Sequence, residues 1–289
     1  MSLPKSYRLI INKRKNLQNR LFVVNKPINI SSNSYLYKIK KKYKVKKAGF
    51  SGTLDPFANG CLIVAFGQYS KLFRFLQKTP KKYRATIWLG VQSSSLDLEN
   101  IISIEDEKKL QKEMIIKSIE SFKGEIKYTP PKFSAKRVDG KRAYELARDD
   151  IEFELKESVM NIYDIRFISY THPFITFEVS VSEGSYIRSL AQFICDKLEV
   201  KGTLSYLQRV NEGKFFYNKE KALNPLEYID LPIARYSGSK EWISLGKKLD
   251  ISYFECKENG VYLLVFDDFF SIIEILNEEI RYILNKVML

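Results

Sequence analysis

One acidic side chain, Asp55, stands inside a glycine-rich loop that leads directly into an apolar segment. Gly49, Gly52 and Gly60 flank this acid, and the apolar residues 61–66 (CLIVAF) predict a short buried strand. The proline after Asp55 pushes its backbone away from helical geometry, and the glycines permit close approaches that bulkier residues forbid. An acid held on a stiff loop at the edge of a sheet suits a nucleophile or a general base. The competing interpretation is an ordinary turn in which the acid is only a cap.

Several short blocks of distinctive composition accompany this loop. The loop itself continues from 52–56 (GTLDP) to Ala58, Gly60, Gly67 and Lys71. The other blocks are 21–27 (LFVVNKP) with 31–33 (SSN); 82–85 (KYRA); 130–135 (PPKFSA) with Gly140 and 144–148 (YELAR); 184–190 (GSYIRSL); and Leu207 with Arg209 and Gly213. Together, in this order, the blocks resemble the TruB-type tRNA pseudouridine synthases. The resemblance covers about residues 20 to 215, and several ordered blocks are more specific than any single motif.

Those enzymes isomerise the T-loop uridine of tRNA, at tRNA position 55, to pseudouridine, so the resemblance implies a T-arm stem-loop as partner. The reaction breaks the N1–C1′ glycosidic bond, turns the uracil and rejoins it through C5. Because no redox step occurs and the uracil leaves as a stabilised anion, the resemblance implies neither a metal nor an organic cofactor. The target uridine is buried in the folded T-loop, so it must be flipped out, at an unstacking cost of a few kcal/mol.

The resemblance also assigns roles to four pocket residues. Asp55 would be the indispensable carboxylate, acting either by adding to C1′ or by assisting proton removal at C2′. Tyr83 would stack on the uracil, and its hydroxyl would take the C5 proton after the base has rejoined. Tyr186 and Leu207 would complete the pocket. The alternatives are a strand aromatic in the core for Tyr83 and ordinary core packing for Leu207.

Arg188 offers an argument that does not depend on the resemblance. Residues 187–198 predict a helix with Ser185 as its N-cap, which places Arg188 in the first turn. The helix macrodipole disfavours a cation there by a few tenths of a kcal/mol, up to about 1 kcal/mol. A carboxylate partner removes the conflict, and Asp55 is the partner that the motif pattern supplies. The pair would orient Asp55 and keep it ionised. Without such a partner, Arg188 is simply a solvated cation.

Candidate RNA contacts lie in the loop and in a basic insertion. Phe50 stands where the family usually has histidine, and the only histidine, His172, lies in an unrelated segment, so we expect no histidine proton shuttle. Phenylalanine can still stack on a base, a contact that contributes about 1–3 kcal/mol. The insertion, about residues 124–150, is rich in aromatic and basic residues and suits a phosphate-facing arm, or else an exposed charged loop. Substrate binding is assigned to Phe50, Tyr186, Leu207, Lys26, Lys132, Lys136 and Arg142.

Two further positions depart from the family's pattern. Glu183 stands where lysine is common, which would weaken the local contact with RNA. Residues 93–95 (SSS), just before Asp97, replace a stretch that is usually richer in threonine. Neither departure removes the acid, the tyrosine or the arginine of the predicted site.

The composition points to a polyanionic partner. The chain has 289 residues, 45% of them hydrophobic, and a formal net charge of +14. Such a charge favours nucleic acid as a partner, although a compositional bias towards lysine explains part of it. The densest patch, Lys38 to Lys47, has apolar residues at helical spacing and lies just before the Asp55 loop. It is either a phosphate-gripping helix or a solvated helix face.

The sequence carries no sign of a membrane span or of secretion. No run of about eighteen apolar residues appears, and the basic stretch from Lys5 to Arg20 lacks the apolar segment of a secretory signal. Cys61, Cys195 and Cys256 are odd in number and have no close cysteine or histidine partner. We therefore expect reduced thiols, no zinc site and a cytoplasmic protein.

The order of elements predicts the fold class. Residues 83–89 and 175–181 alternate as half-buried strands, and residues 105–122 predict an amphipathic helix. Strands and helices interleave without a regular βαβ rhythm, which predicts an α+β fold with a mixed, mostly antiparallel sheet.

Proline, glycine and serine cluster between about 222 and 239 and mark a domain boundary. Residues 260–266 and 280–284 predict short strands beyond it. We therefore expect a pseudouridine-synthase catalytic domain over 1–230 and a small β-rich module over 236–289, PUA-like and RNA-binding as in bacterial members of the family.

The resulting hypothesis is a cytoplasmic, monomeric, cofactor-independent tRNA pseudouridine synthase. Guide-RNA-dependent archaeal and eukaryotic relatives share the catalytic loop, but the short carboxy-terminal module and the lack of long tails favour a stand-alone enzyme. A second hypothesis is an RNA-binding or RNA-folding protein whose catalysis is lost or secondary; Phe50 leaves it open, whereas Asp55, Tyr83 and Arg188 oppose it. A third is a nonspecific basic nucleic-acid binder, which predicts no uridine product and no dependence on Asp55.

Overall fold

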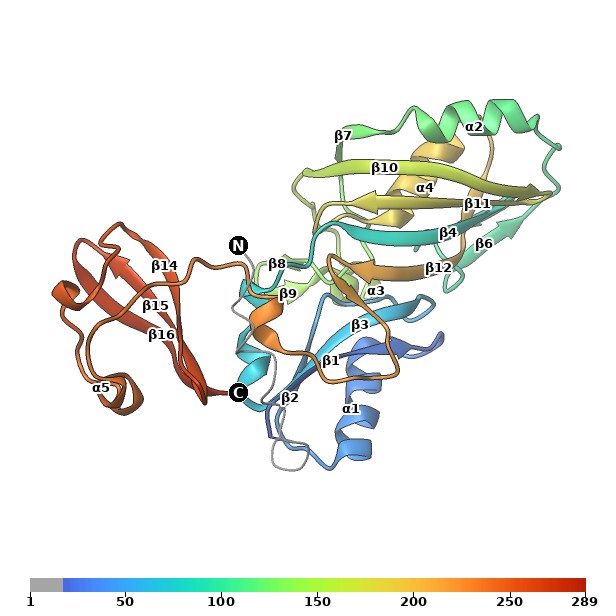
Figure 1. Ribbon diagram of the computed structural model, residues 1–289. Coiled ribbons are helices and arrows are strands. Elements are labelled where there is room, and N and C mark those ends of the chain that lie inside the picture. The colour runs from blue at the N-terminus through green and yellow to red at the C-terminus, as the bar shows by residue number, and fades with distance from the viewer. Residues whose placement is uncertain (1–17) are drawn as a thin grey trace.

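One large sheet is the frame of the molecule (Figure 1). A computed structural model describes residues 18–289, so the basic stretch Lys5 to Arg20 lies almost wholly outside the described residues. The sheet has nine strands. Its order is β1 (Arg20–Lys26), β3 (Asn59–Phe66), β12 (Gly202–Glu212), β4 (Lys81–Leu89), β11 (Phe174–Val181), β10 (Ser158–Thr171) and β7 (Gly124–Tyr128), with β2 (Ala48–Ser51) added to β3 and β13 (Phe215–Phe216) added to β12.

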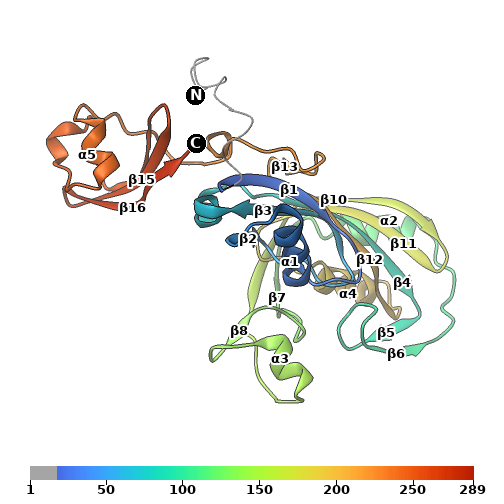
Figure 2. The same ribbon diagram turned by 90° about the horizontal axis from the view of Figure 1, so that it is seen from below.

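Helices cover one face of this sheet. They are α1 (Ser32–Tyr43), α2 (Lys112–Glu120) and α4 (Ile187–Lys197). Figure 2 shows α1 and α4 on the same side of the strands, and an arm projecting from that side. The arm carries β8 (Arg137–Val138), β9 (Lys141–Arg142) and α3 (Ala143–Arg148), and a separate hairpin of β5 (Val91–Ser93) and β6 (Ile101–Ile104) follows β4. Within the described residues, no helix has the length and apolar character needed to cross a bilayer.

A single parallel pairing joins the two halves of the sheet. β12 runs parallel to β3, where Arg209 lies opposite Gly60. The other strand pairs of the described sheet are antiparallel, which confirms the predicted α+β class with a mixed, mostly antiparallel sheet. On its other side β12 is antiparallel to β4, with Arg209 opposite Tyr83. The pairing therefore brings the end of β12 between the glycine-rich loop before β3 and the start of β4.

Alternating side chains of β4 build the main core. Every second residue of the strand is buried, as the sequence alternation predicted, because successive side chains of a strand point to opposite faces. These residues pack with the apolar side of α4, and burying one such side chain contributes about 1.5–3 kcal/mol. The participating residues are Tyr83, Ala85, Ile87 and Leu89 from the strand and Ile187, Leu190, Ala191 and Ile194 from the helix.

Two predicted helix boundaries are wrong. α2 begins at Lys112 rather than at Glu105, whose N–H donates to the Gly90 carbonyl at the end of the β5–β6 hairpin, and irregular chain separates that hairpin from the helix. The N-cap of α4 is Tyr186, which offers no side-chain cap, rather than Ser185. Arg188 nevertheless lies in the first turn of α4, as predicted, where the helix macrodipole disfavours a cation.

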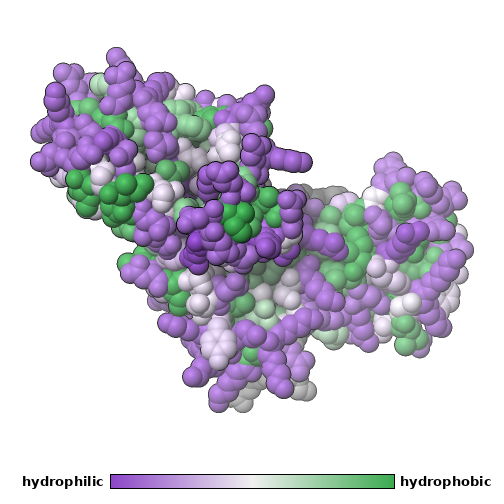
Figure 3. Space-filling view, turned by 180° about the vertical axis from the view of Figure 1, so that it is seen from behind, coloured by the Kyte–Doolittle hydropathy of each residue, from purple (hydrophilic) through white to green (hydrophobic). Residues whose placement is uncertain are grey.

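A small β-rich module forms the carboxy-terminal part, as predicted. Strands β14 (Gly260–Val265), β15 (Phe269–Leu276) and β16 (Glu279–Met288) form an antiparallel sheet, preceded in the chain by the short helix α5 (Lys240–Leu245). Figure 3 shows it as a second lobe, separated by a waist from the large one. Its likeness to a PUA domain stays a prediction.

A second core joins this module to the main sheet. Apolar residues on the outer sides of β1 and β3 pack with the module's strands and with short 3₁₀ turns. The contributing residues are Leu21, Val23, Cys61, Ile63 and Ala65 from the large sheet and Leu263, Phe270, Ile272, Leu284 and Val287 from the module. Within residues 18–289 the 3₁₀ turns are Gly67–Lys71, Phe73–Phe75, Pro225–Glu227 and Ile251–Tyr253.

Candidate active site

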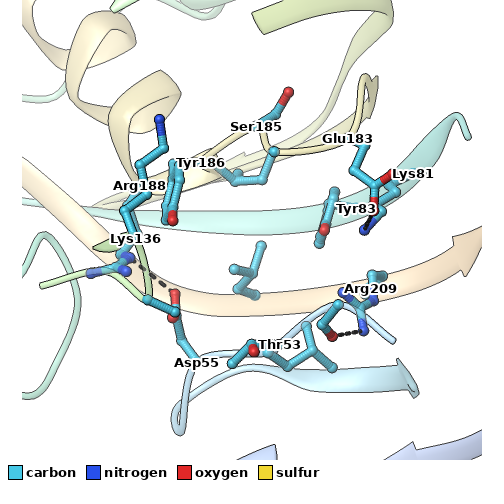
Figure 4. Close-up of a pocket in the computed structure, with 16 residues that line it drawn as sticks. Thr53, Asp55, Lys81, Tyr83, Lys136, Glu183, Ser185, Tyr186, Arg188 and Arg209 are labelled. Carbon is cyan, nitrogen blue, oxygen red and sulfur yellow. Dashed lines mark hydrogen bonds and ion pairs between the residues drawn. The ribbon is translucent and has the colours of Figure 1, made fainter. Parts of the chain in front are cut away.

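The Asp55 loop connects β2 to β3 and forms one wall of a cavity of about 350 Å³ (Figure 4). Gly52 opens the loop with a φ of +66°, a conformation that favours glycine. The buried Ser32 hydroxyl at the start of α1 accepts the Leu54 N–H at 2.9 Å and donates to the Leu54 carbonyl at 3.0 Å. The Ala58 N–H closes the turn by donating to the Asp55 carbonyl at 3.1 Å. Both sides of the acid are thereby fixed.

Asp55 is ion-paired to Arg188, as the macrodipole argument predicted. Arg188 Nε lies 3.0 Å from Asp55 Oδ2, and the two side chains are 2% and 30% exposed. Two backbone carbonyls fix the guanidinium, since Nη1 donates to Ser95 at 2.7 Å and Nη2 donates to Phe133 at 2.8 Å. A planar guanidinium held in this way fixes the orientation of the carboxylate that it binds.

Asp97 is a site residue to which the sequence assigned no role. Its Oδ2 lies 3.5 Å from Arg188 Nη1. Its Oδ1 accepts the Ser95 hydroxyl at 2.6 Å and the Glu99 N–H at 3.0 Å. One guanidinium therefore lies between two carboxylates. The only signal in the sequence is a lone acid after a run of serines, and nothing local indicates that this segment folds back beside α4.

Burial raises the pKa of the Asp55 carboxyl, although part of the side chain faces the cavity. The Arg188 cation acts in the opposite direction, and the nearby Asp97 carboxylate raises the pKa further. Asp55 therefore loses its proton at a higher pH than an aspartate in water. Any activity that needs the carboxylate is then lost as the pH falls through this raised pKa.

Aromatic and aliphatic side chains wall the cavity beside the acid. Tyr83 on β4 and Leu207 on β12 are 7% and 5% exposed, and both line the cavity. Tyr186 lies just before α4, with its ring centroid 6.4 Å from that of Tyr128. Figure 4 shows the two tyrosine rings across the cavity from Asp55. An apolar slot beside a carboxylate suits a flat pyrimidine base attached to a sugar.

The basic residues of the arm occupy three different environments. Lys136 lines the cavity, and its ammonium donates to the Ser158 hydroxyl. Arg142 is half-buried, and its guanidinium donates to the Ala135 carbonyl. Lys132 is exposed. Of the three predicted contacts, Lys136 is thus the one beside the cavity, and Lys132 faces solvent next to it in the chain.

Lys26 does not lie where an RNA contact requires it. The side chain is 0% exposed. Its ammonium donates to the carbonyls of Pro27 at 2.9 Å, Ile30 at 2.6 Å and Pro56 at 3.3 Å. Burial lowers its pKa to about 8. The structure therefore contradicts a direct contact between Lys26 and RNA, and shows instead a buried cation that ties the Lys-Pro turn to the loop just after the acid.

Phe50 lies on β2, outside the cavity wall. It is half-buried, pairs with Val64 of β3 and packs against the main core. Phe50 is not among the residues that line the cavity. Its stacking on a base, or its insertion into RNA as a wedge, stays a prediction.

Glu183 lines the rim of the cavity between two lysines. Its Oε1 lies 3.3 Å from Lys78 Nζ and 3.5 Å from Lys81 Nζ, and its side chain is 52% exposed. Burial acts to raise the pKa of Glu183, but the two ammonium groups outweigh it and lower that pKa. The rim thus carries a carboxylate that pairs with both lysines, and the weaker local contact with RNA stays a prediction.

The arrangement suits acid–base or nucleophilic steps by a carboxylate. Among residues 18–289, no group of three or more His, Cys, Asp or Glu side chains lies close enough to hold a metal ion. Beside the oriented acid and its arginine, two phenols line the cavity, and further charged side chains line it as well: Lys81, Lys136, Glu183 and Arg209. This set can attack a sugar carbon, remove a proton and move a proton on a base.

Relatives of known family share this sequence and fold. Residues 40–187, just over half of the chain, match the model described as "TruB family pseudouridylate synthase (N terminal domain)". A protein named tRNA pseudouridine synthase B from a Sulfurovum species is 55% identical over 269 residues, 93% of this chain and 97% of that protein. A protein of the same name from Campylobacter concisus is 53% identical, over 93% of this chain and 98% of that protein.

A solved structure shows the same fold at lower identity. It is the crystal structure of the archaeal box H/ACA sRNP Nop10-Cbf5 complex, with a TM-score of 0.63, 19% identity, and coverage of 94% of this chain and 86% of that chain. The family match, the identity over most of the length and the arrangement of the cavity residues agree. The chain belongs to the TruB family of pseudouridylate synthases.

Proposed function

We propose that this chain isomerises the T-loop uridine of tRNA to pseudouridine. The observation that carries the proposal is Asp55, held by the buried Arg188 at 3.0 Å and aimed into a cavity with aromatic walls. The relatives named tRNA pseudouridine synthase B, at 50–55% identity over 93% of the chain, support tRNA as the substrate. We also propose that a single chain is the acting unit.

The proposed residue roles follow from the geometry. A uridine flipped into the cavity would place its base between Tyr83, Tyr186 and Leu207 and its ribose near the carboxylate. Asp55 would act in its ionised form, either by adding to C1′ as the glycosidic bond breaks or by assisting removal of the C2′ proton. The uracil would then turn and rejoin through C5, and the Tyr83 hydroxyl would take the C5 proton.

We place the RNA grip on the main domain rather than on the carboxy-terminal module. Residues 236–289 hold six Lys and Arg and nine Asp and Glu, a net charge of −3, which leaves +17 for the rest of the chain. Phosphate contacts dominate the affinity of proteins for nucleic acids. An acidic module is therefore a poor phosphate grip, and we assign it the role of covering the outer sides of β1 and β3.

Neutralising the arm is expected to weaken RNA binding in a salt-dependent way. Each of Lys132→Gln and Lys136→Gln should lower the slope of log affinity against log salt by about 0.7–0.9, because one phosphate contact is lost. Fluorescence anisotropy of a labelled T-arm stem-loop at several salt concentrations measures this slope. Lys248→Gln, which removes the same charge from an exposed site on the acidic module, is the matched control and should leave the slope unchanged. A native slope in all three variants would exclude the arm as the part that binds phosphate.

Removing only the hydroxyl of Tyr83 is expected to slow the chemical step. Tyr83→Phe keeps the ring as a wall of the cavity but removes the proton acceptor, so the single-turnover rate should fall about 10²-fold with unchanged RNA affinity. Tyr69→Phe, at a buried tyrosine of the second core, is the control and should retain the native rate. A native rate in Tyr83→Phe would show that another group takes the C5 proton.

Mapping the product tests the proposed function as a whole. An unmodified tRNA transcript is incubated with the protein, treated with a carbodiimide that forms a stable adduct on pseudouridine, and read by primer extension. We expect one new stop, at the T-loop uridine. Stops at several unrelated uridines would contradict the proposed site selection, and no stop at all would contradict the activity.

A further inference from the structure

Arg209 occupies the point at which the Asp55 loop, β3 and β4 meet. It is 1% exposed, one of the largest fully buried side chains of the chain. On one side its backbone pairs with Gly60, five residues after the acid, and on the other side with Tyr83. The proposed reaction gives Arg209 no step of its own. It nevertheless lies between the Asp55 loop and Tyr83, which both take part in that reaction.

The guanidinium of Arg209 holds the loop from beneath. Nε donates to the Cys61 carbonyl at 2.8 Å, and Nη2 donates to the Gly52 carbonyl at 2.9 Å. Gly52 precedes the acid by three residues, so the arginine fixes the loop at its start while its backbone pairs with the end at Gly60. A Cβ on Gly60 would lie 2.3 Å from the Arg209 carbonyl, so the close approach of the two segments depends on glycine.

Glu212 and Lys81 complete a buried ionic cluster around this arginine. Arg209 Nη2 lies 2.9 Å from Glu212 Oε1, and Lys81 Nζ lies 3.2 Å from Glu212 Oε2, with side-chain exposures of 1%, 0% and 7%. Burial acts to lower the pKa of Arg209, but Glu212 and then Tyr83 raise it, so the cation persists. Buried ion pairs of this kind add little stability over well-packed apolar residues. The cluster is therefore better explained by its holding the attached loop in one orientation than by a gain in the stability of the fold.

We propose that Arg209 is a positioning residue, which fixes the Asp55 loop and the neighbouring Tyr83 through its fork of hydrogen bonds to the Gly52 and Cys61 carbonyls. The inference rests on the proposed function. Arg209 lines the cavity but is 1% exposed, and the inference gives it no step in the reaction itself. Its prediction is that the chemical step, rather than RNA binding, depends on the shape of this side chain.

Three variants separate positioning from charge and from stability. Arg209→Gln removes the charge and the fork, whereas Arg209→Lys keeps a cation for Glu212 but cannot make both carbonyl bonds. Glu178→Gln is the control, because Glu178 is likewise a buried, ion-paired residue of the large sheet, 4% exposed and paired with Lys82, Arg84 and Arg166, but does not line the cavity. Thermal unfolding, T-arm affinity, the single-turnover rate of tritium release and amide exchange in residues 50–58 are measured for each.

The expected pattern is specific. Both Arg209 variants should lower the single-turnover rate about 10²-fold, as small misplacements of reacting groups do, with T-arm affinity within about 3-fold of native. Amide exchange in residues 50–58 should become faster in both, and Arg209→Lys should recover thermal stability without recovering the rate. Glu178→Gln should lose stability and keep the rate.

Other outcomes decide against the inference. A native single-turnover rate in Arg209→Lys would show that only the charge of Arg209 matters. A rate loss in Glu178→Gln as large as that in the Arg209 variants would show that the loss reflects general stability. Unchanged amide exchange in residues 50–58 contradicts loop positioning whatever the rate. No tritium release by the native protein removes the proposed function and this inference with it, so the two failures are distinguishable.

Discussion

Asp55→Asn is expected to lower the rate of tritium release from T-arm RNA by about 10³-fold or more, because no other carboxylate faces the sugar from the same loop. The change keeps the size of the side chain and one acceptor for Arg188. RNA affinity should therefore stay within about 3-fold of native, since phosphate contacts dominate it. Single-turnover tritium release and anisotropy measure the two quantities on the same preparation.

The same variant should be more stable than the native protein at neutral pH. The folded-state pKa of Asp55 is raised, mainly by burial, so the folded state binds the proton more tightly than the unfolded state does. The free energy of unfolding therefore falls as the pH rises through the window between the unfolded pKa and the folded pKa. Asparagine resembles the protonated acid, so the free energy of unfolding of Asp55→Asn does not fall in this way as the pH rises. The melting temperature of Asp55→Asn should exceed the native one above that window and match it below.

Asp164→Asn is the control for both effects, because Asp164 is an exposed acid on β10, with a side-chain exposure of 65%. It should change neither the rate nor the melting temperature. Residual activity of Asp55→Asn near the native level would remove Asp55 from the chemistry. A lower melting temperature for Asp55→Asn at neutral pH would contradict the raised pKa.

Arg188→Gln is expected to have the second largest effect. It should slow the single-turnover rate about 10²-fold, because the carboxylate loses the group that orients it. Asp97, with a side-chain exposure of 4%, then stays buried without its cation, so the free energy of unfolding should fall by about 3 kcal/mol. Tritium release is assayed well below the lowered melting temperature to keep the protein folded.

The pH profile of this variant gives the sharper test. Arg188 lowers the pKa of Asp55, against burial and Asp97. Without the cation that pKa rises, so the acidic limb of the rate should move to higher pH. Arg166→Gln removes an exposed arginine that pairs with Glu178 at 2.7 Å. It should leave the acidic limb of the rate at its native pH. An acidic limb at the native position in Arg188→Gln would contradict the proposed electrostatic role of the pair.

Local pattern was enough to predict the parts that depend on period and composition. The strands at residues 83–89 and 175–181 were correct because one buried face imposes alternation on a strand. A carboxylate partner for Arg188 was predicted because the macrodipole disfavours a cation in the first turn of a helix, and the motif pattern supplied Asp55 as that partner. Residues 269–276 were missed as a strand, since both faces are mostly buried and the polar residues Ser271 and Glu274, three apart, give no two-residue alternation.

Long-range packing decided the parts that the sequence did not show. Lys26 reads as a basic residue beside a turn, yet three carbonyls from two separate turns surround its ammonium. The role of Asp97 depends on the loop between β5 and β6, which brings its carboxylate to Arg188 of α4. Arg209 looked like one residue of a motif, and its position beneath the loop follows only from the parallel pairing of β12 with β3.

We expect this chain to act on one uridine of the T-loop, and tritium release from C5-labelled RNA measures that reaction. T-arm stem-loop RNA made with C5-tritiated uridine is incubated with the native protein until release stops. We expect the release of one equivalent of tritium per RNA. An RNA in which cytidine replaces the T-loop uridine, while the other uridines stay labelled, should release none. Tight binding without release, or equal release from both RNAs, would contradict this expectation.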